Sequence, residues 1–312
     1  MNTRKIVIGA ALVIIGLPVV LVLIAAVSLY VLNRTNGTIV SSGQKREYLL
    51  YVPRSYDRAK PTPLVISMHG GAMWPAAQME TSQWNKVADE HGFIVVYPSG
   101  TGVPQAWHMR EAALMANVRF ISELIDTLEA AYNIDPTRIY ANGFSNGGGM
   151  ATALSCTLSH RIAAVGSVAA AQLHPLSWCA DSRPVPMITF QGTADPLAPY
   201  NGGPSWASPP GYGAFSARIP FLAVRDWTAS WARRNRCGPN PIESVVAADV
   251  TRLEYTHCAD DAAVVLYTVQ GGGHSWPGGK PLLEWFVGPT SRSINASSLM
   301  WAFFRERRLP RK

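Results

Sequence analysis

Short apolar runs that alternate with helix-like segments are the feature of this chain that most constrains its fold. The run from Phe93 to Tyr97 has the continuous hydrophobicity of a strand that is buried on both faces. Residues 117–132 instead repeat apolar side chains at the three- and four-residue spacing of an amphipathic helix. This alternation predicts an α/β fold, with a mostly parallel central sheet and helices on both of its faces.

The alternation of apolar runs and helix-like segments continues along the chain. Strands are expected at residues 48–52, 64–68, 93–97, 138–141, 162–168, 185–190 and 264–269, and helices at 81–91, 117–132, 147–159 and 301–307. Active sites of parallel sheets lie beyond the carboxyl ends of the strands. Polar residues that directly follow a predicted strand are therefore the candidates for function.

The N-terminus carries Arg4 and Lys5 and then, from Ile6 to Leu32, 27 residues without a charge. A membrane-spanning helix needs about 20 such residues, whereas the apolar part of a secretory signal has about 7–15. We therefore expect residues 1–32 to form a transmembrane signal anchor, with the rest of the chain exported. Cleavage near residues 25–28 would instead release a secreted protein. Residues 33–46 are expected to be a polar linker, and residues 47–312 the catalytic domain.

Four cysteines agree with export, because disulfides persist in oxidising compartments. Three pairings are possible, and Cys156–Cys179 with Cys237–Cys258 closes the two shortest loops. The alternative is a cytosolic protein with four buried thiols. No Cys-x-x-Cys motif and no Cys/His cluster occurs, so no metal site is expected.

The formal net charge of +7 permits attraction to anionic surfaces but does not require it. The basic residues are scattered, apart from a group at residues 305–312 that is typical of a solvated chain end. No zinc-finger spacing or RNA-binding motif is present, so we expect no nucleic-acid partner.

Ser145 lies in the pattern Gly143-Phe144-Ser145-Asn146-Gly147, between a predicted strand and a predicted helix. This is the setting of a nucleophile elbow, a sharp turn that presents a reactive serine and that needs small residues on either side. The pattern alone is weak evidence, but its position between strand and helix makes Ser145 the candidate nucleophile.

A serine hydroxyl needs a base within hydrogen-bond reach, and His274 is the histidine best placed to supply it. It follows a predicted strand within the glycine-rich loop 271–278. The base in turn needs an orienting carboxylate, and Asp195 follows the strand predicted at 185–190. The order serine, aspartate, histidine is that of α/β-hydrolases.

Other aspartates compete for the role of the acid. Asp226, Asp260 and Asp261 do not follow a predicted strand directly. Asp195 itself could be no more than a turn former before Pro196.

The oxyanion of a tetrahedral intermediate needs backbone donors. One is expected to be the N–H of Asn146, the residue after the nucleophile, and the other that of Gly71 or Ala72. These two follow His69 and Gly70 after a predicted strand, a segment that could also be an ordinary turn.

Aromatic residues on loops near the predicted site are candidates for binding substrate. Trp74, Trp107 and Trp276, with His69, could line an acyl pocket, although each could equally be structural.

Taken together, these segments resemble the polyhydroxybutyrate depolymerase/feruloyl esterase family of α/β-hydrolases, which includes LpqC-type lipoproteins. The resemblance covers residues 45–305 and rests on segments that occur in family order: Tyr51-Val52-Pro53, His69-Gly70-Gly71, residues 92–98, residues 135–140, Gly143 to Gly148, Gly192 to Pro196 and His274 to Gly278. It implies a serine carboxylesterase with Ser145 as nucleophile, Asp195 as acid, His274 as base and no cofactor. Cys237 and Cys258 also fall where relatives carry paired cysteines.

The chain departs from the family pattern at several points. Relatives often have two acids where this chain has Ala116-Asn117, and Asn117 is expected to cap the helix at 117–132 instead. Gly147 to Gly149 are expected to loosen the start of the following helix. The leader has no cysteine for a lipid, and no Thr-rich linker or binding module follows the hydrolase, which favours soluble esters or oligomers.

The sequence therefore predicts an exported, monomeric serine carboxylesterase. Its expected substrates are hydroxyalkanoate oligomers, feruloyl or aryl esters, or short acyl esters. An acyltransferase or peptidase on the same fold stays an alternative, because fold and triad do not determine the acceptor. A non-catalytic envelope binding protein is a further alternative.

Overall fold

The computed structural model describes residues 31, 33–170, 179, 183–204 and 221–310. The predicted anchor at residues 1–32 therefore lies outside the described residues, apart from Val31. Within the described ranges, no helix has both the length and the hydropathy that crossing a bilayer requires.

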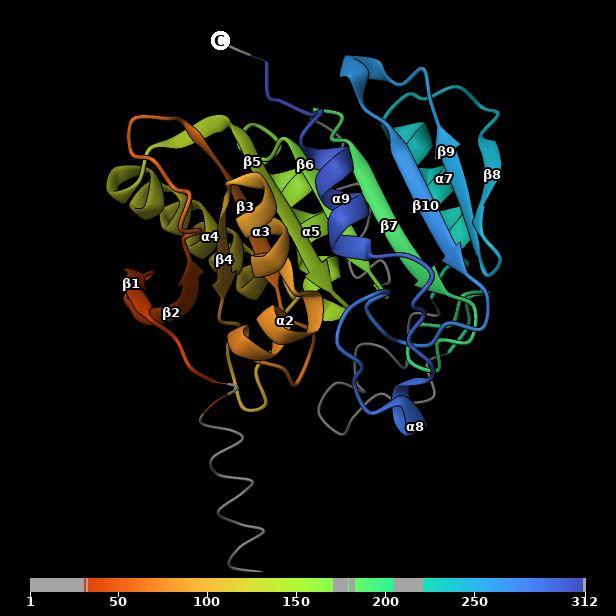
Figure 1. The fold of residues 1–312 in the computed structure, drawn as a ribbon, viewed down its shortest axis with the longest axis horizontal. Coiled ribbons are helices and arrows are strands. Elements are labelled where there is room, and N and C mark those ends of the chain that lie inside the picture. Colours follow the sequence, from red (N-terminus) through yellow and green to blue (C-terminus); the bar gives the residue numbers. More distant parts are fainter. Residues whose placement is uncertain (1–30, 32, 171–178, 180–182, 205–220, 311–312) are drawn as a thin grey trace, which may run out of the picture.

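The described strands form one mixed sheet of ten, in the order β1-β2-β4-β3-β5-β6-β7-β10-β9-β8 (Figure 1). The central strands β4, β3, β5, β6, β7 and β10 are parallel to one another, and β1, β2, β9 and β8 add antiparallel edges. The strands are β1 (Gly37–Ser41), β2 (Gln44–Tyr51), β3 (Thr62–Met68), β4 (Ile94–Pro98), β5 (Ile134–Phe144), β6 (Ala164–Val168), β7 (Met187–Gly192), β8 (Ile242–Ala247), β9 (Val250–Tyr255) and β10 (Val264–Val269).

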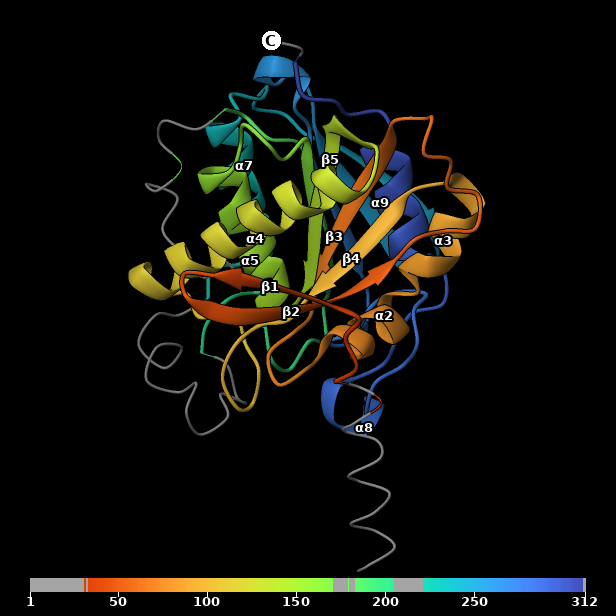
Figure 2. The same cartoon turned by 90° about the vertical axis from the view of Figure 1, so that its left-hand side faces the viewer.

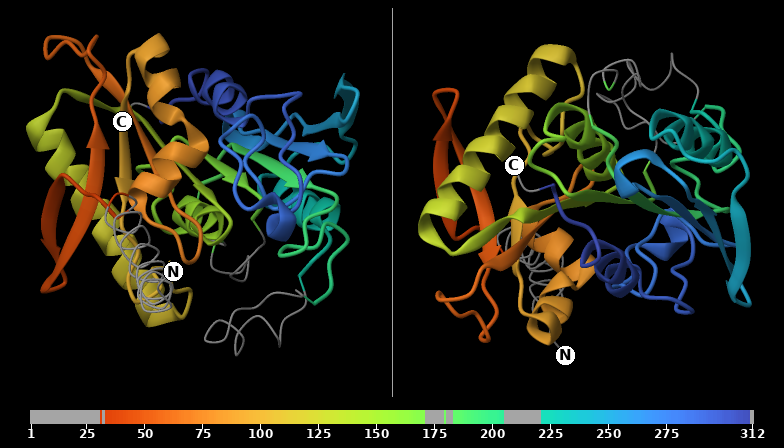
Figure 3. Two further views of the ribbon diagram at one scale, coloured as in Figure 1. Left: turned by 60° about the horizontal axis from the view of Figure 1, so that its bottom comes forward. Right: turned by 90° about the horizontal axis from the view of Figure 1, so that it is seen from above.

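Helices cover both faces of the sheet, as the right-hand view of Figure 3 shows. They are α2 (Pro75–Ser82), α3 (Trp84–His91), α4 (Glu111–Ala131), α5 (Asn146–Thr157), α7 (Val224–Arg234), α8 (Glu284–Val287) and α9 (Ala296–Phe304), with a 3₁₀ turn at Ala259–Asp261. One face packs against α4, α5 and α7, and the other against α2, α3 and α9. The predicted architecture is confirmed.

The uniformly apolar strands supply both cores at once. Leu64, Ile66 and Met68 of β3 join the core under α4, α5 and α7, whereas Val65 joins the opposite core. Successive side chains of a strand point to opposite faces, so a strand that is covered on both faces is mostly apolar, and its few polar side chains are paired, as Ser67 of β3 is with Asn142 of β5 (2.9 Å). This explains the continuous apolar runs.

Several expected element boundaries differ in the structure; the strand expected at 138–141 is longer, and the helix expected at 301–307 is α9, which begins five residues earlier. Two further differences have a local reason. The single helix expected at 81–91 is two helices, because Gln83 adopts a left-handed conformation (φ 56°) that ends α2 and starts α3. The helix expected at 117–132 begins earlier, at Glu111, because residues 112–116 include strong helix formers such as alanine and leucine.

Residues 33–46, expected as a linker, instead contribute β1 and the start of β2. The two strands form a hairpin, with Ser42 and Gly43 at its turn in left-handed conformations (φ 51° and 73°). Exposed and half-buried side chains alternate along β1. This pattern is typical of a polar edge strand, which a sequence reading easily takes for a linker.

Asn117 does not cap a helix but lies buried inside α4, where it is the partner of a buried arginine. Arg46 donates hydrogen bonds to the Asn117 side chain (3.2 Å) and to the Ser99 carbonyl (3.0 Å), and it lies over the Phe120 ring. Burial lowers the pKa of Arg46 to about 10. The side-chain oxygen of Asn117 thus accepts from a largely desolvated cation.

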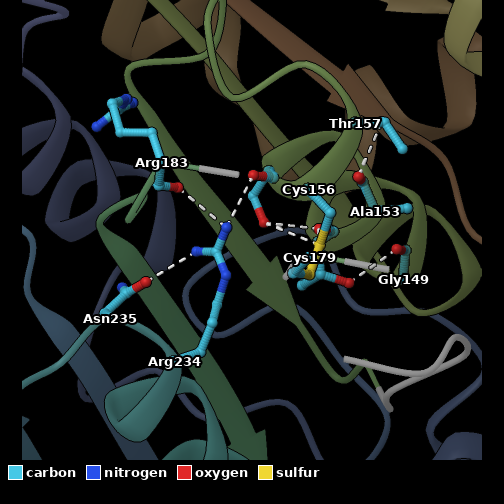
Figure 4. The surroundings of a disulfide bond; sticks show 10 residues. Gly149, Ala153, Cys156, Thr157, Cys179, Arg183, Arg234 and Asn235 are labelled. Carbon is cyan, nitrogen blue, oxygen red and sulfur yellow. Dashed lines mark hydrogen bonds between the residues drawn. A yellow bond between two sulfur atoms is a disulfide. The ribbon is translucent and has the colours of Figure 1, made fainter. Parts of the chain in front are cut away.

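Both disulfides in the structure join cysteines that are neighbours in the sequence, Cys156 to Cys179 and Cys237 to Cys258. Figure 4 shows the first, which ties α5 to the segment at Cys179 with Arg234 beside it. Arg234 donates to the carbonyls of Arg183 (3.0 Å) and Ser155 (3.3 Å). Two disulfides fit an extracellular protein.

We expect Asn117→Ala to lower the free energy of unfolding by about 1–3 kcal/mol, because it leaves a buried guanidinium without one of its acceptors. Urea unfolding followed by circular dichroism measures this change. Thr127→Ala, on the exposed side of the same helix, is the matched control. Equal stability of the two variants would contradict the assigned role of Asn117.

Candidate active site

Ser145 lies at the turn between β5 and α5 and has φ 51° and ψ −118°. Few non-glycine residues adopt such a conformation, and those that do cluster at functional sites. The Ser145 N–H donates to the Val168 carbonyl at the end of β6 (2.8 Å), and the residue is half-buried. The neighbouring strand thereby holds the strained turn in place.

Two glycines allow this turn. A Cβ atom on Gly143 would overlap the backbone of Gly147, and one on Gly147 would overlap the carbonyls of Met68 and His69. The start of α5 is therefore in direct backbone contact with the ends of β5 and β3. Gly147 and Gly148, expected to loosen this helix, permit its close packing.

We expect Gly147→Ala to destabilise the protein by roughly 1–3 kcal/mol through overpacking and to lower kcat by about tenfold or more by displacing Ser145. Thermal unfolding and ester turnover measure the two effects. Gly238→Ala is the control, because its Cβ would meet the Thr256 carbonyl only at 3.4 Å. A fully active, stable G147A variant would contradict the steric argument.

His274 and Asp195 are brought together from the loops that follow β10 and β7. The His274 Nδ1 lies 2.8 Å from the Asp195 Oδ2, and both side chains are buried. The other oxygen, Asp195 Oδ1, accepts from the N–H groups of Leu197 and Ala198, both at 2.8 Å. The carboxylate is thus held from one side by its own loop and faces the imidazole with the other.

The imidazole lies close to the nucleophile turn. The ring centroids of His274 and Phe144, the residue before Ser145, are 5.0 Å apart. Among the described residues, the Ser145 hydroxyl makes no hydrogen bond to the ring. Such bonds are often long before substrate binds and then tighten.

The competing aspartates lie elsewhere on the surface. Asp226 is exposed in the first turn of α7, and Asp260 and Asp261 are exposed in the 3₁₀ turn. Among the described residues, no hydrogen bond or ion pair joins any of the three to His274.

Asn146 begins α5, and its side chain fastens this helix to the loop after β4. It accepts from the Trp107 N–H (2.6 Å) and donates to the Trp107 carbonyl (2.9 Å). Within the described chain its own backbone N–H has no partner, as is usual in the first turn of a helix. That N–H is free to meet an anion.

The structure distinguishes the two candidate donors of the other loop. The Ala72 N–H donates to the Gln105 carbonyl at 2.8 Å. The Gly71 N–H has no partner among the described residues. Gly71 is therefore the donor that is available. Sequence reasoning did not identify Gln105, and no local pattern indicates it.

His69 is fully buried, and both of its ring nitrogens are occupied. Its Nδ1 donates to the Gly70 carbonyl (2.7 Å), and its Nε2 accepts from the Gly100 N–H (2.9 Å). Burial lowers the pKa of His69 to about 4, so the ring is neutral. The ring joins the loop after β3 to the loop after β4, and it has no exposed surface for a substrate.

The three candidate tryptophans have different settings. Trp107 and Trp276 are buried, and their ring N–H groups donate to the His69 carbonyl and the Ser297 hydroxyl, both at 3.0 Å. Trp74 is half-buried just before α2. The exposed aromatic residues near His274 are instead Trp285 and Phe286 on α8. Sequence reasoning missed them, although four of the five residues from Leu282 to Phe286 are apolar.

No group of three histidine, cysteine, aspartate or glutamate side chains suited to a metal ion occurs in the part of the chain that the structure describes.

A serine elbow after a central parallel strand, with an aspartate and a histidine paired beyond two neighbouring strands, defines the α/β-hydrolase class. A family model described as Esterase PHB depolymerase matches residues 46–183. The chain is 30% identical over 279 residues to "Putative esterase NocK" of Nocardia uniformis, covering 84% of this chain and 80% of that protein. The chain therefore belongs to the PHB depolymerase/feruloyl esterase family of carboxylic-ester hydrolases.

Further relatives agree. The chain is 32% identical over 242 residues to feruloyl esterase B of Piromyces equi, a match that covers 75% of this chain but spans only 44% of the length of that relative. Among solved structures, the acetyl xylan esterase from Aspergillus awamori superposes with a TM-score of 0.56 at 14% identity, over 77% of this chain and 93% of the other. This last likeness concerns the fold alone, and it confirms the predicted α/β-hydrolase architecture.

We expect the stability of the protein to fall as the pH drops from about 6.5 to about 4, in part because of His69. The pKa of His69 in the folded protein lies below its value in the unfolded chain, so as the pH falls the unfolded chain takes up a proton first. The contribution of His69 to the free energy of unfolding is therefore complete above pH 6.5 and is lost as the pH falls to 4. The pKa difference corresponds to roughly 3 kcal/mol.

Denaturant unfolding at several pH values measures this dependence. His69→Asn is expected to have a flatter stability profile than the wild type between pH 6.5 and 4, because the remaining titrating groups are common to both proteins. Parallel profiles would show that His69 is not buried in its neutral form.

Proposed function

We propose that this protein is a serine carboxylesterase that works through an acyl-enzyme on Ser145. The observation that carries the proposal is the pairing of the buried His274 and Asp195 at 2.8 Å, beside a serine held in a strained turn. Ser145 attacks the ester carbonyl while His274 takes the hydroxyl proton. The same histidine then protonates the leaving alcohol, and water attacks the acyl-enzyme in a second cycle of proton transfer.

Asp195 orients the imidazole and stabilises it when it becomes charged. Two backbone hydrogen bonds to Asp195 Oδ1 support this role, because they leave only Oδ2 for the histidine. The proton of His274 then lies on Nδ1, and Nε2 is free to accept from the serine.

The oxyanion in this proposal is held by the N–H groups of Asn146 and Gly71. Both lack partners among the described residues, whereas that of Ala72 is already used. The first turn of α5 adds its partial positive charge at the same point. A donor of this kind contributes about 3 kcal/mol to the stability of the transition state.

The proposed substrates are small esters, and among them feruloyl or other aryl esters are the first to test. The support comes from the relatives, several of which are named feruloyl esterases and one a bifunctional acetylxylan esterase/xylanase. Hydroxyalkanoate oligomers and short acyl esters are the other members of the proposed class.

We further propose that the domain is exported and anchored by the apolar segment from Ile6 to Leu32. The absence of charge in that segment and the two disulfides of the domain support this location.

Ser145→Ala is expected to lower kcat on p-nitrophenyl esters by at least about 10³-fold, because it removes the attacking oxygen. Methyl ferulate, acetylated xylan and hydroxybutyrate oligomers complete the substrate panel, with an amide and an acyl-acceptor assay for the alternative activities. Ser244→Ala, at an exposed position on β8, is the control. Equal turnover by wild type and S145A would refute the proposal.

A further inference from the structure

Four exposed apolar side chains lie around the proposed active site, one in the loop after β4 and three at α8, and we call them the rim patch: Val103, Leu283, Trp285 and Phe286. Trp285 is 83% exposed, and Val103 is fully exposed. Single exposed apolar side chains are ordinary, but a cluster marks an interaction site, and Leu283, Trp285 and Phe286 are clustered at α8.

The rim patch flanks the catalytic groups on two sides. On one side, α8 is joined to the catalytic loop, because the Val287 carbonyl accepts from the His274 N–H (2.6 Å). On the other, Val103 belongs to the loop in which Gln105 holds Ala72. Figures 1 and 2 show α8 and α2 at the same end of the molecule, opposite the C-terminus.

The chain enters the domain at this same rim. Asn33 accepts a hydrogen bond from the Gln105 side chain (3.3 Å), and Arg34 lies 4.0 Å from Glu80 on α2. Glu80 also meets Lys280 (3.6 Å), which lies in the loop that leads from His274 to α8. The residues that follow the apolar leader are thus attached next to the rim patch.

The connection between the apolar leader and the domain is short. Asn36 makes two side-chain hydrogen bonds with the backbone of Leu50 (2.7 and 2.9 Å), and β1 starts at Gly37. Only residues 33–36 separate the apolar run from the sheet, a reach of roughly 14 Å even when fully extended. The rim must therefore lie close to whatever surrounds the leader.

We propose that the rim patch docks on the lipid bilayer into which the leader is inserted, so that the mouth of the active site faces the membrane surface. A tryptophan and a phenylalanine next to aliphatic side chains suit the interface between headgroups and acyl chains, where such residues bury about 5–10 Å deep. A lipid surface fits better than a second copy of the chain, because the short connection brings lipid to this rim in every molecule.

This arrangement refines the substrate class. Ester carbonyls of amphiphilic molecules at the membrane surface reach the proposed oxyanion site without crossing water. That statement rests on the esterase function proposed above, but the docking does not, so it is tested with the inactive S145A chain.

The test is quenching of Trp285 fluorescence by brominated lipid. The full chain with its leader, verified by intact mass, is reconstituted into phosphatidylcholine/phosphatidylglycerol vesicles with and without brominated acyl chains. The emission of Trp285 is obtained by subtracting the tryptophan fluorescence of the S145A chain that also carries Trp285→Phe from that of the S145A chain. Brominated lipid is expected to quench roughly half or more of this difference, because the ring lies within the interface.

Val245→Trp is the matched control, since it adds a tryptophan at a 77% exposed position on β8, away from the rim. Its extra emission is expected to stay unquenched. The proposal is overturned if Trp285 and the added tryptophan respond alike. It is also overturned if Trp285 stays unquenched in the vesicles. Light scattering in detergent would then show whether Trp285 instead contacts a second copy of the chain, as a dimer that W285F dissociates would indicate.

Discussion

The close approach of α5 to the ends of β5 and β3 is the contact on which the rest of the site depends. Backbone touches backbone at Gly143 and Gly147, and a single methyl group at either position would separate them. Because the helix starts so near the strands, Ser145 has no room for an ordinary conformation and is held with φ 51°. Strain of this kind costs about 1–3 kcal/mol, and the two apolar cores on the sheet supply the rigidity that maintains it.

The close packing of α5 against the end of β3 also determines how the loops at the carboxyl ends of the strands are held. Once α5 lies against the end of β3, the loop after β3 has to satisfy its buried polar groups locally. His69 does so with both ring nitrogens, and Gln105 does so by accepting from Ala72. Within the described part of the chain, the N–H groups of Gly71 and Asn146 have no partner, and the proposed oxyanion site consists of these two donors.

The N-terminal hairpin links the site to the leader. It extends the sheet by two antiparallel strands; Asn36 is bound to Leu50 of β2, and Asn33 accepts a hydrogen bond from Gln105 at the rim. Because this polar segment is held against the domain, it limits how the face that carries the proposed active site can be oriented relative to the leader. The membrane-facing orientation proposed here follows from that short, fixed connection.

Local patterns determined a large part of this protein. Hydrophobic runs such as residues 93–97 predicted the buried parallel strands, and the glycines around Ser145 predicted its turn, because both depend on side-chain size and polarity along a short stretch. The hairpin at β1 and the break at Gln83 escaped prediction, since exposed edges and single left-handed residues leave little trace in hydrophobicity. Only the tertiary structure decided three other features: which N–H near Gly71 stays free, why Asn117 is buried and where Trp285 lies. The first two depend on Gln105 and Arg46, which lie tens of residues away along the chain, and the third depends on the contact of α8 with the loop of His274. No local sequence pattern carries such pairings.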